Sequence, residues 1–164
     1  MSNRIEMNRA WAMPNKFPFL ITPIKQILHQ YVHGEWADPF ANDHSPAKYT
    51  NDLNPRMSTQ YHLDALEFLR NFKNNSLDGI LLDPPYSFHQ VVQCYEGYGK
   101  RKKISMVYDE ASRILKENGY AITFGWNSNG VGKKRGMEII EICLLAHGGS
   151  HNDTIVTIEA KIAE

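Results

Sequence analysis

Short apolar runs alternate with amphipathic stretches along most of this chain of 164 residues. Apolar residues recur at helical spacing in three segments, so we predict helices at 21–32, 64–72 and 104–117. Compact apolar runs bounded by turn residues predict strands, and the expected strands are 35–40, 49–53, 61–63, 78–83 and 120–126. Residues 1–20 contain aromatic residues and prolines that follow neither the helical nor the strand periodicity, so we expect an irregular arm there.

Two longer segments near the C-terminus, 137–146 and 153–161, are joined by a Gly-Gly turn and predict an antiparallel hairpin. With the alternation of strands and helices before it, this hairpin predicts an α/β fold: a mostly parallel, doubly wound, Rossmann-like sheet that ends in an antiparallel hairpin. The connection from Phe40 to Tyr49 is too short for a usual crossover helix, which we expect to be nearly absent. Segment 86–103 is expected to be a long polar, aromatic and basic loop.

The length of the chain fits one domain, and we expect residues 1–164 to form it without a separate recognition domain. The two cysteines lack CxxC spacing, and neither a signal-like N-terminus nor a long apolar span is present. These features predict a reduced cytoplasmic location and no membrane partner. His29 and His33 have helical ligand spacing, but no carboxylate or cysteine accompanies them, so we expect no metal site.

The tetrapeptide Asp83-Pro84-Pro85-Tyr86 follows the apolar run 79–82 directly. A strand that enters two prolines ends abruptly, and a carboxylate, a free carbonyl and an aromatic ring follow it. The Asp83 carboxylate and the Pro84 carbonyl can each accept an N–H of an exocyclic base amine, which localises the nitrogen lone pair. Pro85 would stiffen this loop, and Tyr86 would stack on a base. The alternative is a plain turn with Tyr86 packed on the surface.

This tetrapeptide resembles the motif of amino-methyltransferases that use S-adenosylmethionine on DNA, particularly small adenine-N6 enzymes of phages and prophages. The resemblance implies methyl transfer to the N6 amine of adenine in DNA, with Asp83, Pro84, Pro85 and Tyr86 as catalytic residues. It also implies a bacterial host or a phage-infected cell as the location. Aspartate at the first position, in place of serine or asparagine, favours adenine over cytosine or protein glutamine. RNA adenine-N6 or DNA cytosine-N4 methylation remains an alternative, as does a catalytically weak cofactor- or DNA-binding protein of the same fold.

Three acidic residues, Asp38, Asp52 and Asp64, fall at the ends of predicted strands, where ligands bind in open α/β sheets. The resemblance places Asp38 at the methionine end of the cofactor, Asp52 at the ribose hydroxyls and Asp64 at the adenine amine. The full set that it implies for S-adenosylmethionine is Lys16, Phe17, Asp38, Phe40, Ala41, Asp52, Leu53, Asp64, Ala65 and Asp83.

The residues alone leave simpler roles open for these acids. Asp64 can be a helix N-cap, Asp52 a turn former, and Asp38 a strand terminator before proline. The resembling enzymes usually carry a Gly-x-Gly turn after the phenylalanine, whereas Ala41-Asn42 stands here. Because asparagine tolerates the left-handed conformation, a close backbone approach remains possible.

Eighteen basic and eighteen acidic side chains cancel, so the net charge does not indicate a polyanionic partner. Positive charge is instead concentrated in two segments, each of which comes after a predicted strand. Their members, the candidate nucleic-acid-binding residues, are Lys100, Arg101, Lys102, Lys103, Lys133, Lys134 and Arg135. We expect them to contact phosphates at the edge that carries Asp83, although such runs can also be solvated loops. We predict DNA as the partner, with RNA as the alternative. We expect weak sequence preference unless a partner subunit or dimerisation supplies sequence readout. The expected state is a monomer or a homodimer, with association with a partner subunit as the alternative.

Overall fold

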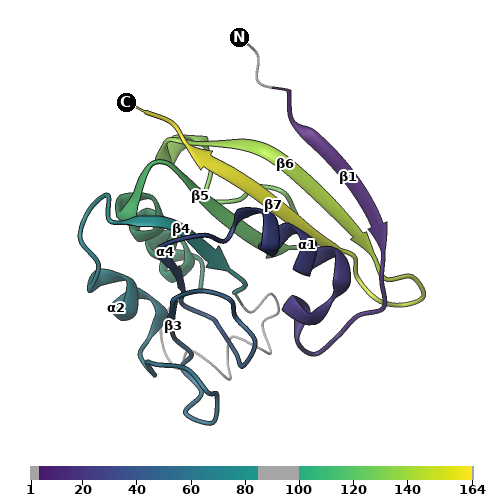
Figure 1. The fold of residues 1–164 in the computed structure, drawn as a ribbon, viewed down its shortest axis with the longest axis horizontal. Coiled ribbons are helices and arrows are strands. Elements are labelled where there is room, and N and C mark those ends of the chain that lie inside the picture. Colours follow the sequence, from purple (N-terminus) through teal and green to yellow (C-terminus); the bar gives the residue numbers. More distant parts are fainter. Residues whose placement is uncertain (1–3, 85–99, 164) are drawn as a thin grey trace.

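The computed structural model describes residues 4–84 and 100–163, whose arrangement is shown in Figure 1. Within these ranges, a seven-stranded sheet has the order β1-β6-β7-β5-β4-β2-β3. Its strands are Glu6–Trp11 (β1), Trp36–Asp38 (β2), Tyr49–Thr50 (β3), Leu77–Leu82 (β4), Leu115–Gly125 (β5), Met137–Ala146 (β6) and Thr154–Lys161 (β7). The strands β2 to β5 pair in parallel, and β7 runs antiparallel to both β5 and β6. The predicted α/β sheet with its C-terminal hairpin is therefore confirmed.

Helices cover both faces of this sheet. They are α1 (Thr22–Tyr31), α2 (Ala65–Arg70) and α4 (Lys100–Ile114), with 3-10 turns at Pro18–Leu20 (η1) and Lys133–Arg135 (η2). Side chains of β4 alternate between the two faces: Leu81 packs in the apolar cluster with α1, and Ile80 and Leu82 pack in the cluster with α2 and α4. Because β4 is buried on both sides, it appears in the sequence as a continuous apolar run.

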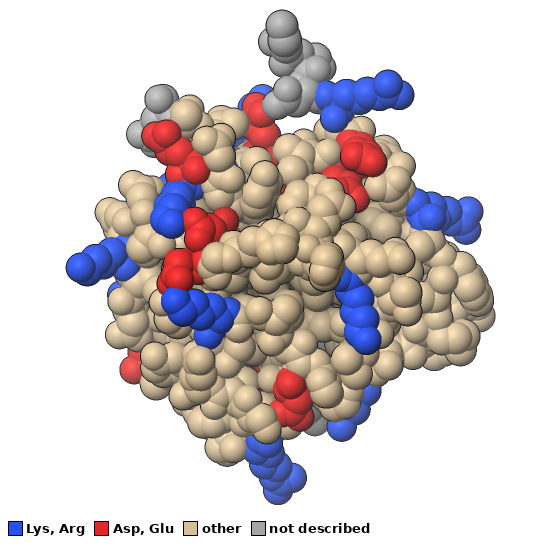
Figure 2. All heavy atoms as spheres, in the orientation of Figure 1, with Lys and Arg blue, Asp and Glu red and all other residues tan. Residues whose placement is uncertain are grey.

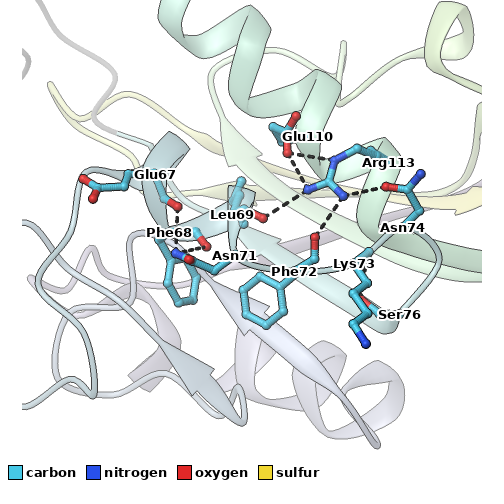
Figure 3. Close-up of polar contacts among 10 residues, drawn as sticks. All are labelled: Glu67, Phe68, Leu69, Asn71, Phe72, Lys73, Asn74, Ser76, Glu110 and Arg113. Atoms are coloured by element: carbon cyan, nitrogen blue, oxygen red, sulfur yellow. Dashed lines mark hydrogen bonds and ion pairs between the residues drawn. The ribbon is translucent and has the colours of Figure 1, made fainter.

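Arg113 of α4 joins this helix to the C-terminal end of α2 (Figure 3). Its guanidinium donates to the carbonyl oxygens of Leu69 (3.3 Å) and Phe72 (2.9 Å) and to the side-chain oxygen of Asn74 (2.7 Å). It also pairs with Glu110 on its own helix at 2.6 Å. The last carbonyls of a helix lack intrahelical partners, so a cation there both satisfies them and interacts favourably with the helix dipole.

The N-terminal segment differs from the expected irregular arm. Glu6–Trp11 forms β1 and pairs in parallel with β6 over six residues. Most of its side chains are exposed, so no buried period marks the strand in the sequence. Backbone pairing with β6, a contact distant along the chain, decides the conformation here.

Two other predictions are corrected. The strand expected at 61–63 reduces to one bridge between Asn51 and Tyr61. The loop expected to extend to residue 103 ends earlier, because the helix expected to begin at residue 104 begins at Lys100.

The start of β5 also differs from the prediction. The helix expected to extend to residue 117 ends at Ile114, and β5 begins at Leu115 rather than Tyr120. Asn118 has φ 60°, and the β4–β5 register shifts over this segment. The Asn118-Gly119 pair therefore marks an irregularity within a strand and not the end of a helix.

Charges of both signs are interspersed over the face drawn in Figure 2, in keeping with the equal numbers of basic and acidic residues. In residues 4–84 and 100–163, none of the helices combines the length and the apolar character that crossing a bilayer requires.

Candidate active site

The carboxyl ends of three neighbouring parallel strands bring three acidic residues to one edge of the sheet. Asp38 is the last residue of β2, Asp52 follows β3, and Asp83 follows β4 directly. The charges of Asp83 and Asp52 both act on the Asp38 carboxyl group. Two of the three acids predicted at strand ends, Asp38 and Asp52, are thus grouped with Asp83 at the edge where ligands bind in open α/β sheets.

Asp38 is completely buried at the centre of this edge. Its Oδ2 accepts a hydrogen bond from Ser45 Oγ at 2.6 Å, and its Oδ1 accepts one from the Phe40 backbone N–H at 3.0 Å. Burial raises the pKa of Asp38 to about 7, and the nearby Asp83 and Asp52 charges add to the increase, while the two hydrogen bonds oppose it. The carboxyl group is therefore partly protonated near neutral pH, and this edge favours a cationic or hydrogen-bond-donating ligand group.

The turn after β2 reaches β3 without a helix, as expected from its length. Asn42 adopts the left-handed conformation at φ 53°, and its backbone N–H donates to Asp52 Oδ2 at 3.1 Å. Ala41 is 1% exposed and donates its N–H to the Asn51 carbonyl at 2.8 Å, while Phe40 packs against the cluster of α2 and α4. Asn42 thus adopts the positive φ that the sequence left open, a conformation that asparagine tolerates better than most residues.

Asn51 is a structural residue of this edge that the sequence analysis missed. It is fully buried, and its Nδ2 donates to the carbonyls of Pro39 (3.1 Å) and Leu63 (2.9 Å). Its Oδ1 accepts the Leu63 N–H at 2.9 Å. The side chain therefore joins the segments that follow β2 and precede α2. The sequence did offer one signal for this role, namely an amide side chain inside a predicted strand.

Asp52 and Asp64 both take the local roles that the sequence left open. Asp52 Oδ1 accepts the Asn54 N–H at 2.8 Å, which shapes the turn, and Asp64 caps α2 by accepting the Leu66 N–H at 3.0 Å. A carboxylate can accept up to about four hydrogen bonds, so these local roles are compatible with binding a ligand. Leu53 is 42% exposed beside Asp52, whereas the Ala65 side chain is buried in the core.

Lys16 and Phe17 lie beside the turn after β2. The Phe17 ring meets the His44 ring edge to face, with centroids 4.5 Å apart, and Lys16 Nζ lies 5.4 Å from the Phe17 centroid. Because His44 belongs to the β2–β3 connection, this segment lies next to that connection. Its part in cofactor binding stays a prediction.

A cavity of about 1180 Å³ adjoins the end of β4. Pro84 is buried and lines it, together with the start of α4, the end of β5 and the segment that leads to η2. The volume is somewhat above the range of about 300–1,000 Å³ typical of small-molecule sites. Pro85 and Tyr86, the other two predicted catalytic residues, lie outside the described residues.

The basic residues of η2 lie at this cavity, as expected for the edge that carries Asp83. Lys133 and Lys134 are exposed. Arg135 instead makes internal bonds: its Nε donates to Asp109 Oδ1 at 2.6 Å and its Nη2 to Ser105 Oγ at 2.8 Å. The other predicted basic residues, Lys100, Arg101, Lys102 and Lys103, form the first turn of α4.

The sequence matches no protein-family model and no curated protein. Solved structures do share the fold. TrmN from Thermus thermophilus superposes with a TM-score of 0.58 at 15% identity, over 87% of this chain and 49% of its own. The N-methyltransferase NodS from Bradyrhizobium japonicum gives a TM-score of 0.58 at 11% identity, over 87% of this chain and 94% of its own.

A third structure carries a bound product of methyl transfer. The 1,6-didemethyltoxoflavin-N1-methyltransferase from Burkholderia thailandensis, solved with S-adenosylhomocysteine, gives a TM-score of 0.60 at 11% identity, over 86% of this chain and 77% of its own. The present chain spans about half the length of TrmN and most of the other two proteins. At such identities the likeness is one of fold alone: the sheet and its helices superpose on those of TrmN and of the two N-methyltransferases.

Proposed function

We propose that this protein transfers the methyl group of S-adenosylmethionine to the N6 amine of adenine in DNA. The observation that carries the proposal is the position of Asp83 and Pro84. They follow β4 at the edge that holds Asp38 and Asp52, and Pro84 lines a cavity large enough for a nucleotide unit. In open α/β sheets, this edge is where ligands bind.

The chemistry of the edge fits S-adenosylmethionine, which carries two positive charges, two ribose hydroxyls and an adenine amine. Asp38, with Asp52 and Asp83 near it, provides acceptors and negative charge for such groups. The other residues proposed to hold the cofactor are Lys16, Phe17, Phe40, Ala41, Leu53, Asp64 and Ala65. When bound, S-adenosylmethionine would supply a methyl group attached to a positively charged sulfur.

The residues after β4 are proposed to act on the amine. The Asp83 carboxylate and the Pro84 carbonyl each accept one N–H, which draws the nitrogen out of conjugation and localises its lone pair. Pro85 keeps this segment stiff, and Tyr86 stacks on the base. After transfer the nitrogen loses its extra proton readily, so Asp83 does not have to be a strong base.

Adenine in DNA is the proposed target because Asp83 occupies the first position of the tetrapeptide. The exposed lysines of η2, together with the basic first turn of α4, would contact phosphates and read no sequence. We therefore expect weak sequence preference for this chain acting alone.

The test is transfer of a labelled methyl group to unmethylated DNA and to RNA, followed by analysis of the modified nucleoside. We expect N6-methyladenine in DNA from the wild type. In D83A, which removes an acceptor aimed at the reacting group, kcat should fall about a hundredfold or more. D83N keeps a neutral amide oxygen as acceptor and loses the negative charge, so kcat should fall less than in D83A. The matched control is E117Q, an exposed acid next to Asn118, which should retain full activity.

Three outcomes would contradict parts of the proposal. If methylcytosine or methylated RNA were the main product, adenine in DNA would not be the target. Binding of S-adenosylhomocysteine without transfer to any nucleic acid would favour a binding protein of the same fold. Full activity in D83A would remove the role given to the end of β4.

A further inference from the structure

Trp126 is a large aromatic side chain at the wall of the cavity beside Pro84. It directly follows β5, and it is 52% exposed. Since β4 and β5 pair in parallel with Leu82 opposite Thr123, the chain leaves both strands at the same edge. Trp126 therefore shares a cavity with the segment proposed to hold the reacting amine.

The backbone segment after Trp126 is hydrogen-bonded to Glu159 of β7. The Glu159 carboxylate is buried and accepts the N–H groups of Val131 at 2.7 Å and Gly132 at 2.9 Å. At Gly130, with φ 56°, an added Cβ would lie within 2.3 Å of the Glu159 carboxylate. Charge-assisted bonds to two consecutive amides fix this backbone, and only glycine fits at residue 130.

Arg135 holds the same segment from the side of α4. Its Nη1 donates to the Val131 carbonyl at 2.9 Å, while Nε and Nη2 bond to Asp109 and Ser105 of α4. Both polar groups of the Val131 peptide backbone are thus bound, the N–H by Glu159 and the carbonyl by Arg135. The segment that leads from Trp126 to η2 is therefore bonded to two separate elements, through the backbone of Val131 and Gly132.

The chemistry of the wall selects the kind of occupant. The indole of Trp126 offers a flat apolar face, and the exposed Lys133 and Lys134 bring positive charge to the same cavity. Proteins that bind single-stranded nucleic acid combine these two features: bases stack on aromatic rings and phosphates meet lysines. A purely apolar ligand would not use the lysines, and a phosphate alone would not use the indole.

We infer that an unpaired base of the substrate also stacks on Trp126, in addition to the contact proposed for Tyr86, with Glu159 and Arg135 as the positioning residues of this wall. This inference rests on the proposed function, because it supplies a second contact that would hold a base next to Asp83 and Pro84.

The test uses a short single-stranded DNA in which one adenine is replaced by 2-aminopurine. The fluorescence of 2-aminopurine falls when this base stacks on an indole. Titration with the wild type should quench it. W126A and W126L should bind about tenfold more weakly and lose the quenching, since one base–aromatic contact is removed. W126F, which keeps an aromatic face, should bind within about threefold of the wild type. The matched control is W11A: Trp11 is 64% exposed at the end of β1 and should not affect binding.

The inference is overturned if W126A binds and quenches like the wild type, if W126F is as weak as W126L, or if the wild type does not bind the probe. Because the readout needs no methyl transfer, it separates this inference from the proposed function. Loss of binding in W126A, with no methyl transfer by the wild type, would remove the function and keep the binding site. Loss of methyl transfer in D83A, with normal DNA binding and turnover in W126A, would support the proposed function and remove the stacking role of Trp126.

Discussion

Three fully buried polar side chains organise the loops of this protein at the scale of single residues. Asp38, Asn51 and Glu159 are each 0% exposed, and each accepts hydrogen bonds from backbone N–H groups of a loop near the functional edge. A buried polar group costs free energy unless it is hydrogen-bonded, so these residues hold the loops in one conformation only while their bonds are intact.

Asn51 provides a direct test of this arrangement. N51A would leave the carbonyls of Pro39 and Leu63 and the Leu63 N–H without their partner, and we expect the free energy of unfolding to fall by about 2–4 kcal/mol. Denaturant unfolding measures this change, with the exposed Asn152 as the control site in N152A. A decrease of less than about 0.5 kcal/mol in N51A would show that the amide does not hold the strand ends.

At the scale of elements, η2 contains two kinds of basic residue. Lys133 and Lys134 extend into solvent at the cavity, whereas the Arg135 side chain is 25% exposed and bonded to α4. Equal positive charge along a sequence therefore does not mean equal function. The guanidinium, with donors in a fixed planar arrangement, suits an internal junction, and the lysines suit phosphates.

This difference predicts two separable mutant phenotypes. The double variant K133A/K134A should reduce the slope of log affinity for single-stranded DNA against log salt by about 1.4, because two phosphate contacts are lost, and it should leave stability unchanged. R135A should lower the free energy of unfolding by about 1–3 kcal/mol through its lost bonds to Val131 and Ser105. Salt-dependent binding and denaturant unfolding measure the two effects. An unchanged salt slope in the double variant would exclude phosphate contacts by these lysines.

For the whole molecule, buried and exposed carboxyl groups respond to pH in opposite ways. Burial raises the pKa values of Asp38 and Glu159, while hydrogen bonds from Lys116 and Lys48 lower those of Asp78 and Glu35, respectively. A group whose pKa is raised on folding stabilises the protein when the pH is below its pKa in the unfolded chain. This stability is lost as the pH rises through its pKa in the folded protein. A lowered pKa contributes stability that is lost as pH falls.

Asp38 should dominate between pH 4 and 7, because its pKa rises from 3.8 to about 7 on folding. The difference of about three pH units corresponds to about 4 kcal/mol that the wild type loses over this window. D38N, which cannot ionise there, should not show this loss. Unfolding free energies of both proteins, measured from pH 4 to 8, should therefore diverge in favour of D38N as pH rises. A constant difference would mean that Asp38 ionises as freely in the folded protein as in the unfolded chain.

The sequence by itself determined the elements whose signal is local. The buried run of β4, the turn chemistry of the C-terminal hairpin and the cap of α2 depend on residues that are neighbours along the chain, and all three appear in the structure. Asp38 and Asp52, at the ends of β2 and β3, were predicted to lie at one edge for a similar reason, since parallel strands in one sheet end together.

Only the tertiary structure decided the features that depend on contacts between distant residues. β1 is a strand because β6 pairs with it, and Asn51 matters because two other loops meet its amide. Arg135 and Trp126 both lie in the segment after β5 and both line the cavity, but the fold brings bonding partners on α4 to Arg135 and leaves Trp126 half exposed. Side-chain identity sets what a residue can bond to, and the folded chain sets which partners come within reach.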